Sequence, residues 1–340
     1  MESREIIRRV IKRDDPPRVG LRLKKSGYPN DILVLPSFGS VSAVEGDWGR
    51  DPALVGRVPG FAGQLRTDVY GNIWGRLDGL TKGECVLGRF EQDWSAADDW
   101  VPPQLDRSSR PAVDAALASG KGRWALGMLP GMPFSILRCL RGMENTLTDV
   151  LLEEDRVRSV IDRMVPYLLS HVDANADAGA DAVYSGEDWG TQEALLVSPG
   201  TWRSLFSQAF RAVAERAHER GMVYVVHSCG FIHDIIPDLL DAGVDVFQFD
   251  QPTLVGVERL AREFGSRVTF WSPVDIQAVM PVADRERIEN EARLMIREFG
   301  RDGGGFIAAD YTDWPSINIP DEKAEWARQV FLKEGIYRNV

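Results

Sequence analysis

The second half of the chain alternates short apolar runs with segments in which apolar residues recur at helical spacing. The run at 222–226 is apolar at nearly every position, which is typical of a strand buried on both faces. After it, Ile232, Ile235 and Leu239 recur at helical spacing before Gly243, a pattern that predicts a helix closed by glycine. Repeated units of this kind indicate a parallel βα sheet. The strands are predicted at 181–184, 222–226, 244–249, 267–271 and 306–309.

The first half of the chain is less regular than the second. A stretch between about residues 39 and 110 is rich in Gly, Trp, Asp and Pro and contains a predicted β-hairpin at 68–74. We interpret this stretch as an elaboration on the sheet. The other predicted elements of this half are a leading helix at 4–12, strands at 32–35 and 124–128, and a long helix that ends at Gly179.

These segments supply seven strands of a barrel, and the eighth strand has no assignment. The run of uniform βα units favours a (β/α)8 TIM barrel with N-terminal helical and hairpin elaborations over an open doubly wound sheet. The doubly wound alternative lacks its fingerprint, because no G-x-G-x-x-G follows a predicted strand. We therefore expect one barrel domain over residues 1–340, with the elaboration in 1–120 and the main βα units in 121–340.

The composition narrows the class of protein. The chain has 340 residues and a formal net charge of −11, from 40 Lys and Arg against 51 Asp and Glu. Such an acidic chain has no electrostatic reason to bind nucleic acid or an anionic membrane surface. No apolar run is long enough to span a bilayer, and the first residues lack the apolar core of a signal peptide. With three cysteines and no disulfide framework, the sequence predicts a cytoplasmic protein.

The active sites of (β/α)8 barrels lie at the carboxyl ends of their strands. His227 and Cys229 follow a predicted strand, and residues i and i+2 there point to the same side. An imidazole and a thiol side by side suit zinc, which in catalytic sites has three protein ligands and one open position. For the third ligand, the strand-end residues Glu187, Asp188 and Asp310 remain open. In the alternative interpretation, His227 belongs to a hydrogen-bond network and Cys229 is a small buried side chain.

The same strand ends carry candidate catalytic and substrate-binding residues. The candidates for proton transfer are Glu187, Asp188, His227 and Asp310. In the competing interpretation, the carboxylates are solvent-exposed loop residues at the rim of the barrel. Aromatic side chains at the mouth are candidates for stacking on a substrate, although ordinary core packing is the alternative for each. The candidate substrate-binding residues are Trp74, Trp189, Gln251, Trp271 and Tyr311.

Several segments carry motifs of a known family. They are Asp15–Val19, Thr67–Trp74, Phe134–Glu144, Asp188–Gln192 with Ser198–Pro199, His227–Gly230, and Gly243–Asp245. Together they resemble the uroporphyrinogen decarboxylase-like superfamily, specifically its corrinoid-dependent methyltransferase and demethylase branch. The resemblance implies a (β/α)8 barrel, often a homodimer, in which a His-x-Cys pair and a distant cysteine hold zinc. His227 and Cys229 match that pair, but no cysteine stands near Asp310, where the third ligand is expected.

The resemblance also implies an activity. A methyltransferase of the demethylase type would move a methyl group from a small methoxylated or methylated-amine donor, with metal assistance, to a corrinoid. The chain has no Asp-x-His-x-x-Gly motif, so the corrinoid is expected on a separate protein. One alternative is a decarboxylase or lyase that uses a carboxylate and His227 for proton transfer on a carboxylated substrate. Another is a barrel that binds a ligand without turnover. Porphyrinogen decarboxylation is disfavoured, because Pro36–Ser40 lacks the arginines of a carboxylate clamp.

Overall fold

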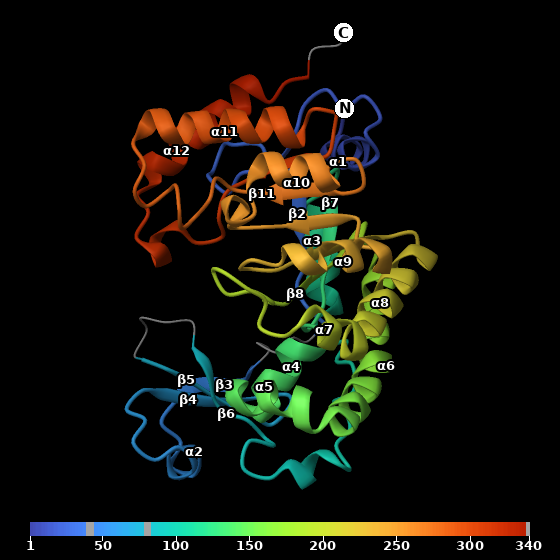
Figure 1. The fold of residues 1–340 in the computed structure, drawn as a ribbon, viewed down its shortest axis with the longest axis vertical. Coiled ribbons are helices and arrows are strands. Elements are labelled where there is room, and N and C mark those ends of the chain that lie inside the picture. Colours follow the sequence, from blue (N-terminus) through green and yellow to red (C-terminus); the bar gives the residue numbers. More distant parts are fainter. Residues whose placement is uncertain (39–43, 78–82, 338–340) are drawn as a thin grey trace.

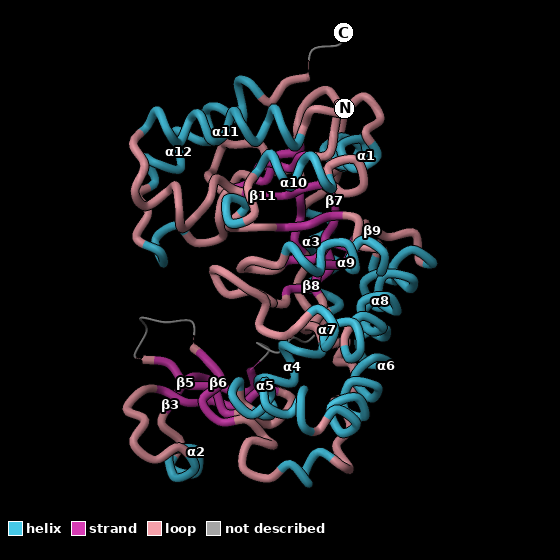
Figure 2. Tube along the Cα trace, viewed as in Figure 1, coloured by secondary structure: helices cyan, strands magenta, loops and turns pink. Residues whose placement is uncertain are grey.

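The structure is a computed structural model that describes residues 1–38, 44–77 and 83–337. It contains an eight-stranded parallel sheet with helices around it and a separate four-stranded antiparallel sheet (Figures 1 and 2). The hydrogen-bonded order of the large sheet is β1-β12-β11-β10-β9-β8-β7-β2. Its strands are β1 (Gly20–Arg22), β2 (Ile32–Val34), β7 (Trp124–Met128), β8 (Ala182–Gly186), β9 (Val223–His227), β10 (Val246–Gln248), β11 (Thr269–Ser272) and β12 (Phe306–Ala309).

The two end strands of this order, β1 and β2, lie next to each other and nearly close the ring. The backbone N–H of Asp31, just before β2, donates to the carbonyl oxygen of Leu21 in β1 at 2.7 Å. This hydrogen bond links the two strands. The predicted (β/α)8 barrel is therefore confirmed. The strand that had no assignment is β1, which is three residues long and lies only ten residues before β2.

Helices cover the outside of the barrel, and one closes its amino-terminal end. Ile6, Ile7 and Val10 of the leading helix pack against the apolar side chains inside the barrel. A Cβ atom at Gly20 would lie 2.7 Å from the Cδ1 of Ile7, so the glycine lets the helix pack closely here. With this end filled by apolar side chains, the carboxyl end of the strands remains for the site. The helices are α1 (Ser3–Lys12), α3 (Arg110–Ser119), α4 (Pro133–Arg141), α5 (Met143–Leu152), α6 (Glu154–Ala178), α7 (Pro199–Leu205), α8 (Ser207–Glu219), α9 (Ile236–Ala242), α10 (Val257–Phe264), α11 (Arg285–Phe299) and α12 (Asp321–Glu334).

The small sheet lies beside α4 and α5, far from α11 and α12 (Figure 1). It consists of β3 (Val44–Gly49), β4 (Gln64–Asp68), β5 (Ile73–Arg76) and β6 (Glu84–Leu87), and α2 (Pro52–Arg57) lies between its first two strands in the chain. The predicted hairpin is formed by β4 and β5. The Asp68 carboxylate organises its turn, because it accepts the backbone N–H groups of Tyr70 and Asn72 at 2.9 Å each.

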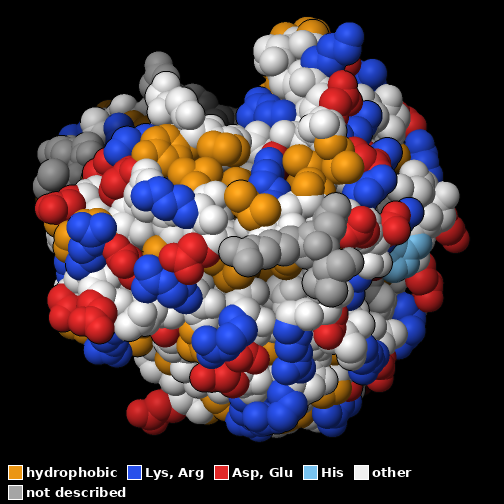
Figure 3. All heavy atoms as spheres, turned by 90° about the horizontal axis from the view of Figure 1, so that it is seen from above, with side chains coloured by type: hydrophobic (Ala, Val, Ile, Leu, Met, Phe, Trp, Pro, Cys, Tyr) orange, Lys and Arg blue, Asp and Glu red, His pale blue; other side chains and the backbone are white. Residues whose placement is uncertain are grey.

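Figure 3 shows one face of the molecular surface. On this face, basic and acidic side chains are interspersed. Within the described residues, every helix is too short or too polar to cross a bilayer.

Candidate active site

The carboxyl ends of the barrel strands enclose a cavity of about 470 Å³. Every strand contributes to its lining, either with a residue of its own or with one from the loop that follows. The cavity therefore lies where barrel enzymes carry out their chemistry. Its lining residues are Arg22, Val34, Leu126, Met128, Tyr184, Asp188, His227, Cys229, Gln248, Asp250, Trp271, Asp310, Tyr311 and Thr312.

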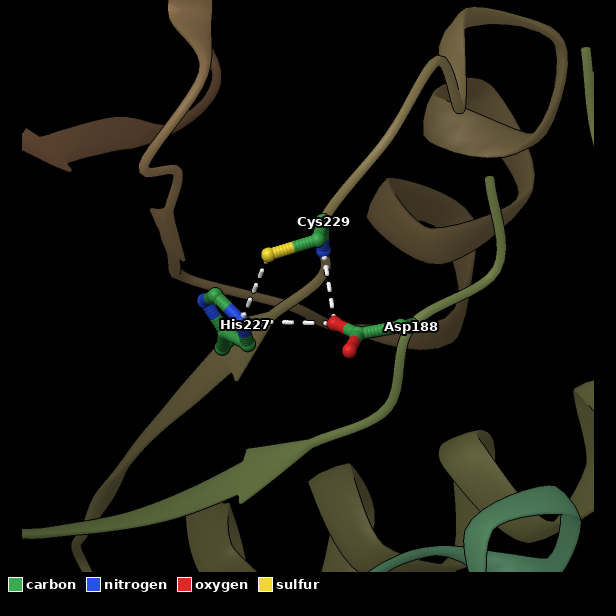
Figure 4. Close-up of side chains that lie close together, drawn as sticks. All are labelled: Asp188, His227 and Cys229. Carbon is green, nitrogen blue, oxygen red and sulfur yellow. Dashed lines mark hydrogen bonds and ion pairs between the residues drawn. The ribbon is translucent and has the colours of Figure 1, made fainter. Parts of the chain in front are cut away.

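Three polar side chains meet at one wall of the cavity (Figure 4). His227 ends β9, Cys229 follows it in the same loop, and Asp188 follows β8. The Nε2 atom of His227 lies 3.4 Å from the Oδ1 atom of Asp188 and 3.4 Å from the Sγ atom of Cys229. The potential ligand atoms all lie within 4.8 Å of one another, and we call these residues the ligand cluster.

Two glycines bring the loops of the ligand cluster together. Gly230 has a φ of +84°, and a Cβ atom there would lie 2.1 Å from the carbonyl oxygen of Gly190. A Cβ atom at Gly190 would lie 2.5 Å from the backbone nitrogen of Phe231. Both positions therefore require glycine for the close backbone contact, and Gly230 requires it also for its left-handed conformation. Next to this contact, the backbone N–H of Cys229 donates to Oδ1 of Asp188 at 2.8 Å. The backbone thus fixes the carboxylate beside the thiol.

The orientation of the His227 ring is set by a backbone carbonyl. Nδ1 lies 3.2 Å from the carbonyl oxygen of Gln248, which can only accept a hydrogen bond. Nδ1 therefore carries the proton, and in the neutral ring Nε2 presents its lone pair to Asp188 and Cys229. Metal-binding histidines are usually held in this way by a carbonyl or carboxylate on the other nitrogen.

The charges of the ligand cluster depend on one another. Burial would raise the pKa of Asp188, but the hydrogen bond and charge of His227 hold it well below its usual range. Burial would lower the pKa of His227, but Tyr184, Asp188 and Cys229 raise it well above its usual value. Burial raises the pKa of the Cys229 thiol. Without a cation, the cluster is therefore held together by an ionised carboxylate and a protonated imidazole.

The donor set of the ligand cluster fits a zinc ion. It offers one carboxylate oxygen, one imidazole nitrogen and one thiol sulfur, and all three residues line the open cavity. Three protein ligands with an accessible fourth position are the arrangement of a catalytic zinc site. The nitrogen and sulfur donors disfavour magnesium and calcium, which take oxygen ligands.

Glu187, a candidate for both metal binding and catalysis, does not join the ligand cluster. Its side chain is buried, and its Oε1 atom accepts the backbone N–H of Ser135 at 2.7 Å, at the start of α4. Its Oε2 atom has no partner among the described residues. Burial raises the pKa of Glu187 to about 8. This carboxyl group therefore links β8 to α4, behind the cavity wall to which Asp188 belongs.

Asp310, the other expected third ligand, lines the cavity but is fully occupied by protein partners. Arg328 Nε donates to its two oxygens at 2.9 and 3.0 Å, and the backbone N–H of Lys24 donates to Oδ2 at 2.8 Å. The indole N–H of Trp314 lies 3.3 Å from Oδ1. We call Asp310 and Arg328 the ion-pair anchor. The third candidate ligand is therefore Asp188 rather than Asp310 or Glu187.

The structure divides the expected substrate-binding residues into two groups. Trp271 and Tyr311 line the cavity. Trp189 does not, because it is fully buried and stacks on Phe134 at 4.5 Å between ring centres. Trp74 donates its indole N–H to Asp68 at 2.8 Å and lines a different cavity, beside β6 and α4. Gln251 lies behind the ligand cluster, where its Oε1 accepts the backbone N–H of Gly230 at 3.0 Å.

Sequence reasoning missed several polar residues of the cavity, among them Arg22, Tyr184 and Gln248. Tyr184 and Gln248 lie inside predicted strands, and Arg22 ends the strand that had no assignment. The tyrosine and the glutamine interrupt otherwise apolar runs, and Arg22 stands between two leucines. A polar residue among apolar ones near the end of a barrel strand is therefore the signal that points to the cavity.

Comparisons with known proteins agree with this architecture. The chain belongs to the uroporphyrinogen decarboxylase (URO-D) family, which matches residues 109–310. A curated relative, the methylated-thiol–coenzyme M methyltransferase of Methanosarcina mazei, is 24% identical over 201 residues, which are 57% of this chain and 52% of the relative. The chain thus spans about half the length of that relative. A solved methyltransferase from Methanosarcina mazei has a TM-score of 0.62 at 14% identity and covers 98% of this chain and 99% of its own. At this identity, the likeness shows the fold.

Proposed function

We propose that the protein is a methyltransferase of the demethylase type. It takes a methyl group from a small methoxylated or methylated-amine donor bound in the cavity and passes it to a corrinoid carried by a separate protein. Asp188, His227 and Cys229 hold the metal, which we propose to be zinc. The observation that carries this proposal is the ligand cluster, in which three different donor atoms converge at the wall of the barrel cavity.

The residues of the chain have separate roles in this reaction. When bound, zinc polarises the heteroatom that carries the methyl group and makes it a better leaving group. The carbonyl of Gln248 keeps Nε2 of His227 directed at the cluster, and the N–H of Cys229 fixes the Asp188 carboxylate. Trp271 and Tyr311 supply apolar walls that exclude water from the reacting methyl group.

Relatives named for methyl transfer support this assignment, although their names describe only those proteins. The charge of the cavity speaks against porphyrinogen decarboxylation. Arg22 is the one arginine among the lining residues, whereas Asp188, Asp250 and Asp310 are carboxylates. A substrate with eight carboxylates would meet repulsion rather than a clamp.

The second candidate is decarboxylation of a smaller carboxylated substrate. It is favoured by the contact between Nε2 of His227 and Oδ1 of Asp188 at 3.4 Å, because an acid and a base in contact can move a proton to the product carbon. This reaction needs neither a corrinoid protein nor a metal.

One experiment separates the two candidates. The purified protein, zinc-loaded or treated with a chelator, is incubated with a corrinoid protein and a panel of methyl-labelled donors, and the label on the corrinoid protein is measured. We expect transfer that requires metal and is lost in Cys229→Ala and His227→Ala. Carbon dioxide release from a carboxylated panel without a corrinoid protein, together with the absence of label transfer, would replace methyl transfer by decarboxylation.

A further inference from the structure

Arg22 places a positive charge inside the cavity. It is the last residue of β1, and its neighbours Leu21 and Leu23 are buried in the hydrophobic core between the barrel and its helices. Since side chains of a strand alternate between its two faces, Arg22 belongs to the inner face and lines the cavity. An arginine thus stands where the other strands carry mostly apolar or aromatic side chains.

The guanidinium of Arg22 has no polar partner among the residues that the structure describes. No hydrogen bond or ion pair from these residues reaches it, and its Nε atom is buried without a partner. The ring of Trp271 lies beside it, with its centre 5.3 Å from the guanidinium carbon. Arg22 is half-buried, and a partly desolvated charge without a protein partner costs free energy that an anionic ligand would offset.

Three other shielded arginines of the molecule are paired with carboxylates. Arg328 contacts Asp310 at 2.9 Å, Arg141 contacts Asp149 at 2.6 Å, and Arg18 contacts Asp31 at 2.7 Å. Arg22 departs from this pattern, as does Arg66 in the small sheet, and of these two only Arg22 faces the cavity. The carboxylates in its vicinity have other partners, because Asp310 is paired with Arg328 and Asp250 accepts the side-chain amide of Gln248 at 2.8 Å.

We propose that Arg22 and the face of Trp271 form a subsite for one anionic group, a carboxylate or a sulfonate, of the substrate. A guanidinium donates two parallel hydrogen bonds to such a group, and the indole holds the guanidinium in place. This inference rests on the proposed function, in that the opposite end of the same substrate carries the methyl group and lies at the ligand cluster.

A row of aromatic groups connects the two ends of this substrate site. The ring centre of Tyr184 lies 6.4 Å from that of Trp271 and 6.3 Å from that of His227. The row thus leads from the guanidinium, over Trp271 and Tyr184, to the imidazole of the ligand cluster. A small molecule with an anion at one end and a methylated heteroatom at the other fits this arrangement. A single arginine beside three carboxylates admits one anionic group and excludes polyanions.

Equilibrium binding tests this subsite without any methyl transfer. The probes are 3-methoxypropionate, 2-methoxyethanesulfonate and the neutral 3-methoxypropan-1-ol, titrated into zinc-loaded protein by calorimetry. Charged hydrogen bonds of this kind predict that each anion binds at least about tenfold more tightly than the alcohol. Arg22→Met should abolish this preference, Arg22→Lys should keep part of it, and the exposed Arg203→Gln should bind like the wild type.

Two results would overturn the subsite. If the anions bind the metal instead, Cys229→Ala removes the preference for them and Arg22→Met keeps it. The second result that would overturn the subsite is an equal affinity for the alcohol and the anions, or no saturable binding of any probe. Arg22→Met should fold with an equal or higher melting temperature, because it removes a half-buried charge that has no protein partner. A failure of methyl transfer with an intact anion preference would refute the proposed function but not the subsite.

Discussion

Two sides of the barrel mouth carry carboxylates at equivalent places and use them differently. Asp188 follows β8 and Asp310 follows β12, and both line the cavity. Both oxygens of Asp310 accept donors from the protein, above all Nε of Arg328 at 2.9 and 3.0 Å. Asp188 instead meets His227 and Cys229, whose potential ligand atoms converge with its own.

The difference shows that a place at the end of a barrel strand makes a carboxylate a candidate metal ligand. The hydrogen-bond partners of that carboxylate then decide whether it is free to bind a metal. A guanidinium, one backbone N–H and an indole N–H donate to the oxygens of Asp310, so no cation is needed there. In the ligand cluster, three groups that can each give an electron pair face one another, which is favourable when a cation lies between them. The following predictions test this contrast, beginning with the largest effect.

Asp310→Ala should destabilise the fold by about 3 kcal/mol, because it removes the bidentate partner of the buried Arg328 guanidinium, which then keeps only the contacts to Asp321 at 2.6 Å and Glu325 at 3.5 Å. Zinc affinity should stay at the wild-type value. Chemical denaturation and a zinc titration measure the two quantities. As a control, the double variant with Arg328→Met should be more stable than Asp310→Ala alone. Loss of zinc from a folded Asp310→Ala protein would make Asp310 a ligand and remove the contrast.

Cys229→Ala should lower the zinc affinity by at least about 100-fold, more than is usual when only an outer partner of a ligand is removed. The free energy of unfolding of the metal-free protein should change little, because Cys229 is only half-buried. Metal analysis after dialysis against a competing chelator measures the zinc affinity. Cys139→Ala, which removes a thiol outside the cavity, is the matched control. Equal zinc binding by both variants would contradict the assignment of the ligand cluster.

Glu187→Gln should change how stability depends on pH. Burial raises the pKa of Glu187 from the ordinary 4.5 to about 8 in the folded protein, so between these values the unfolded chain has already lost a proton that the folded protein keeps. The contribution of Glu187 to stability is complete below about pH 4.5 and is lost as the pH rises to about 8. In this window the wild type should lose up to about 1.4 kcal/mol per pH unit relative to Glu187→Gln.

Denaturant titrations from pH 5 to pH 8, on metal-free protein, measure this difference. Parallel curves for the wild type and Glu187→Gln would mean that the Glu187 carboxyl is ionised throughout. A zinc affinity that is unchanged in Glu187→Gln would agree with its place behind the cavity wall. It would sharpen the contrast between this residue and Asp188, its neighbour in the chain.

The sequence predicted the fold well, because the apolar runs of the parallel strands and the glycines that end the helices are local signals. It failed at β1, where three residues with an inward arginine have no apolar period to detect. That strand carries Arg22, so the missed element and the missed cavity residue have one cause. The same alternation of a polar residue among apolar ones is visible at Tyr184 and Gln248.

The candidate site was predicted in part. His227 and Cys229 were found because a two-residue spacing after a strand is a local property, and both line the cavity. The choice between Asp188, Glu187 and Asp310 depended on contacts distant in the chain. Arg328 lies 18 residues after Asp310, and Ser135 lies 52 residues before Glu187. No local pattern indicates such partners.

The smallest predicted effect concerns the third donor to the ion-pair anchor. The indole N–H of Trp314 lies 3.3 Å from Oδ1 of Asp310, a long hydrogen bond beside the shorter ones from Arg328 and Lys24. Trp314→Phe removes this donor and keeps most of the ring, so the free energy of unfolding should fall by about 1 kcal/mol or less. A loss as large as that of Asp310→Ala would mean that the indole, rather than Arg328, holds Asp310. The contrast between the two sides of the mouth would then rest on the packing of the loop after β12 and not on the buried ion pair.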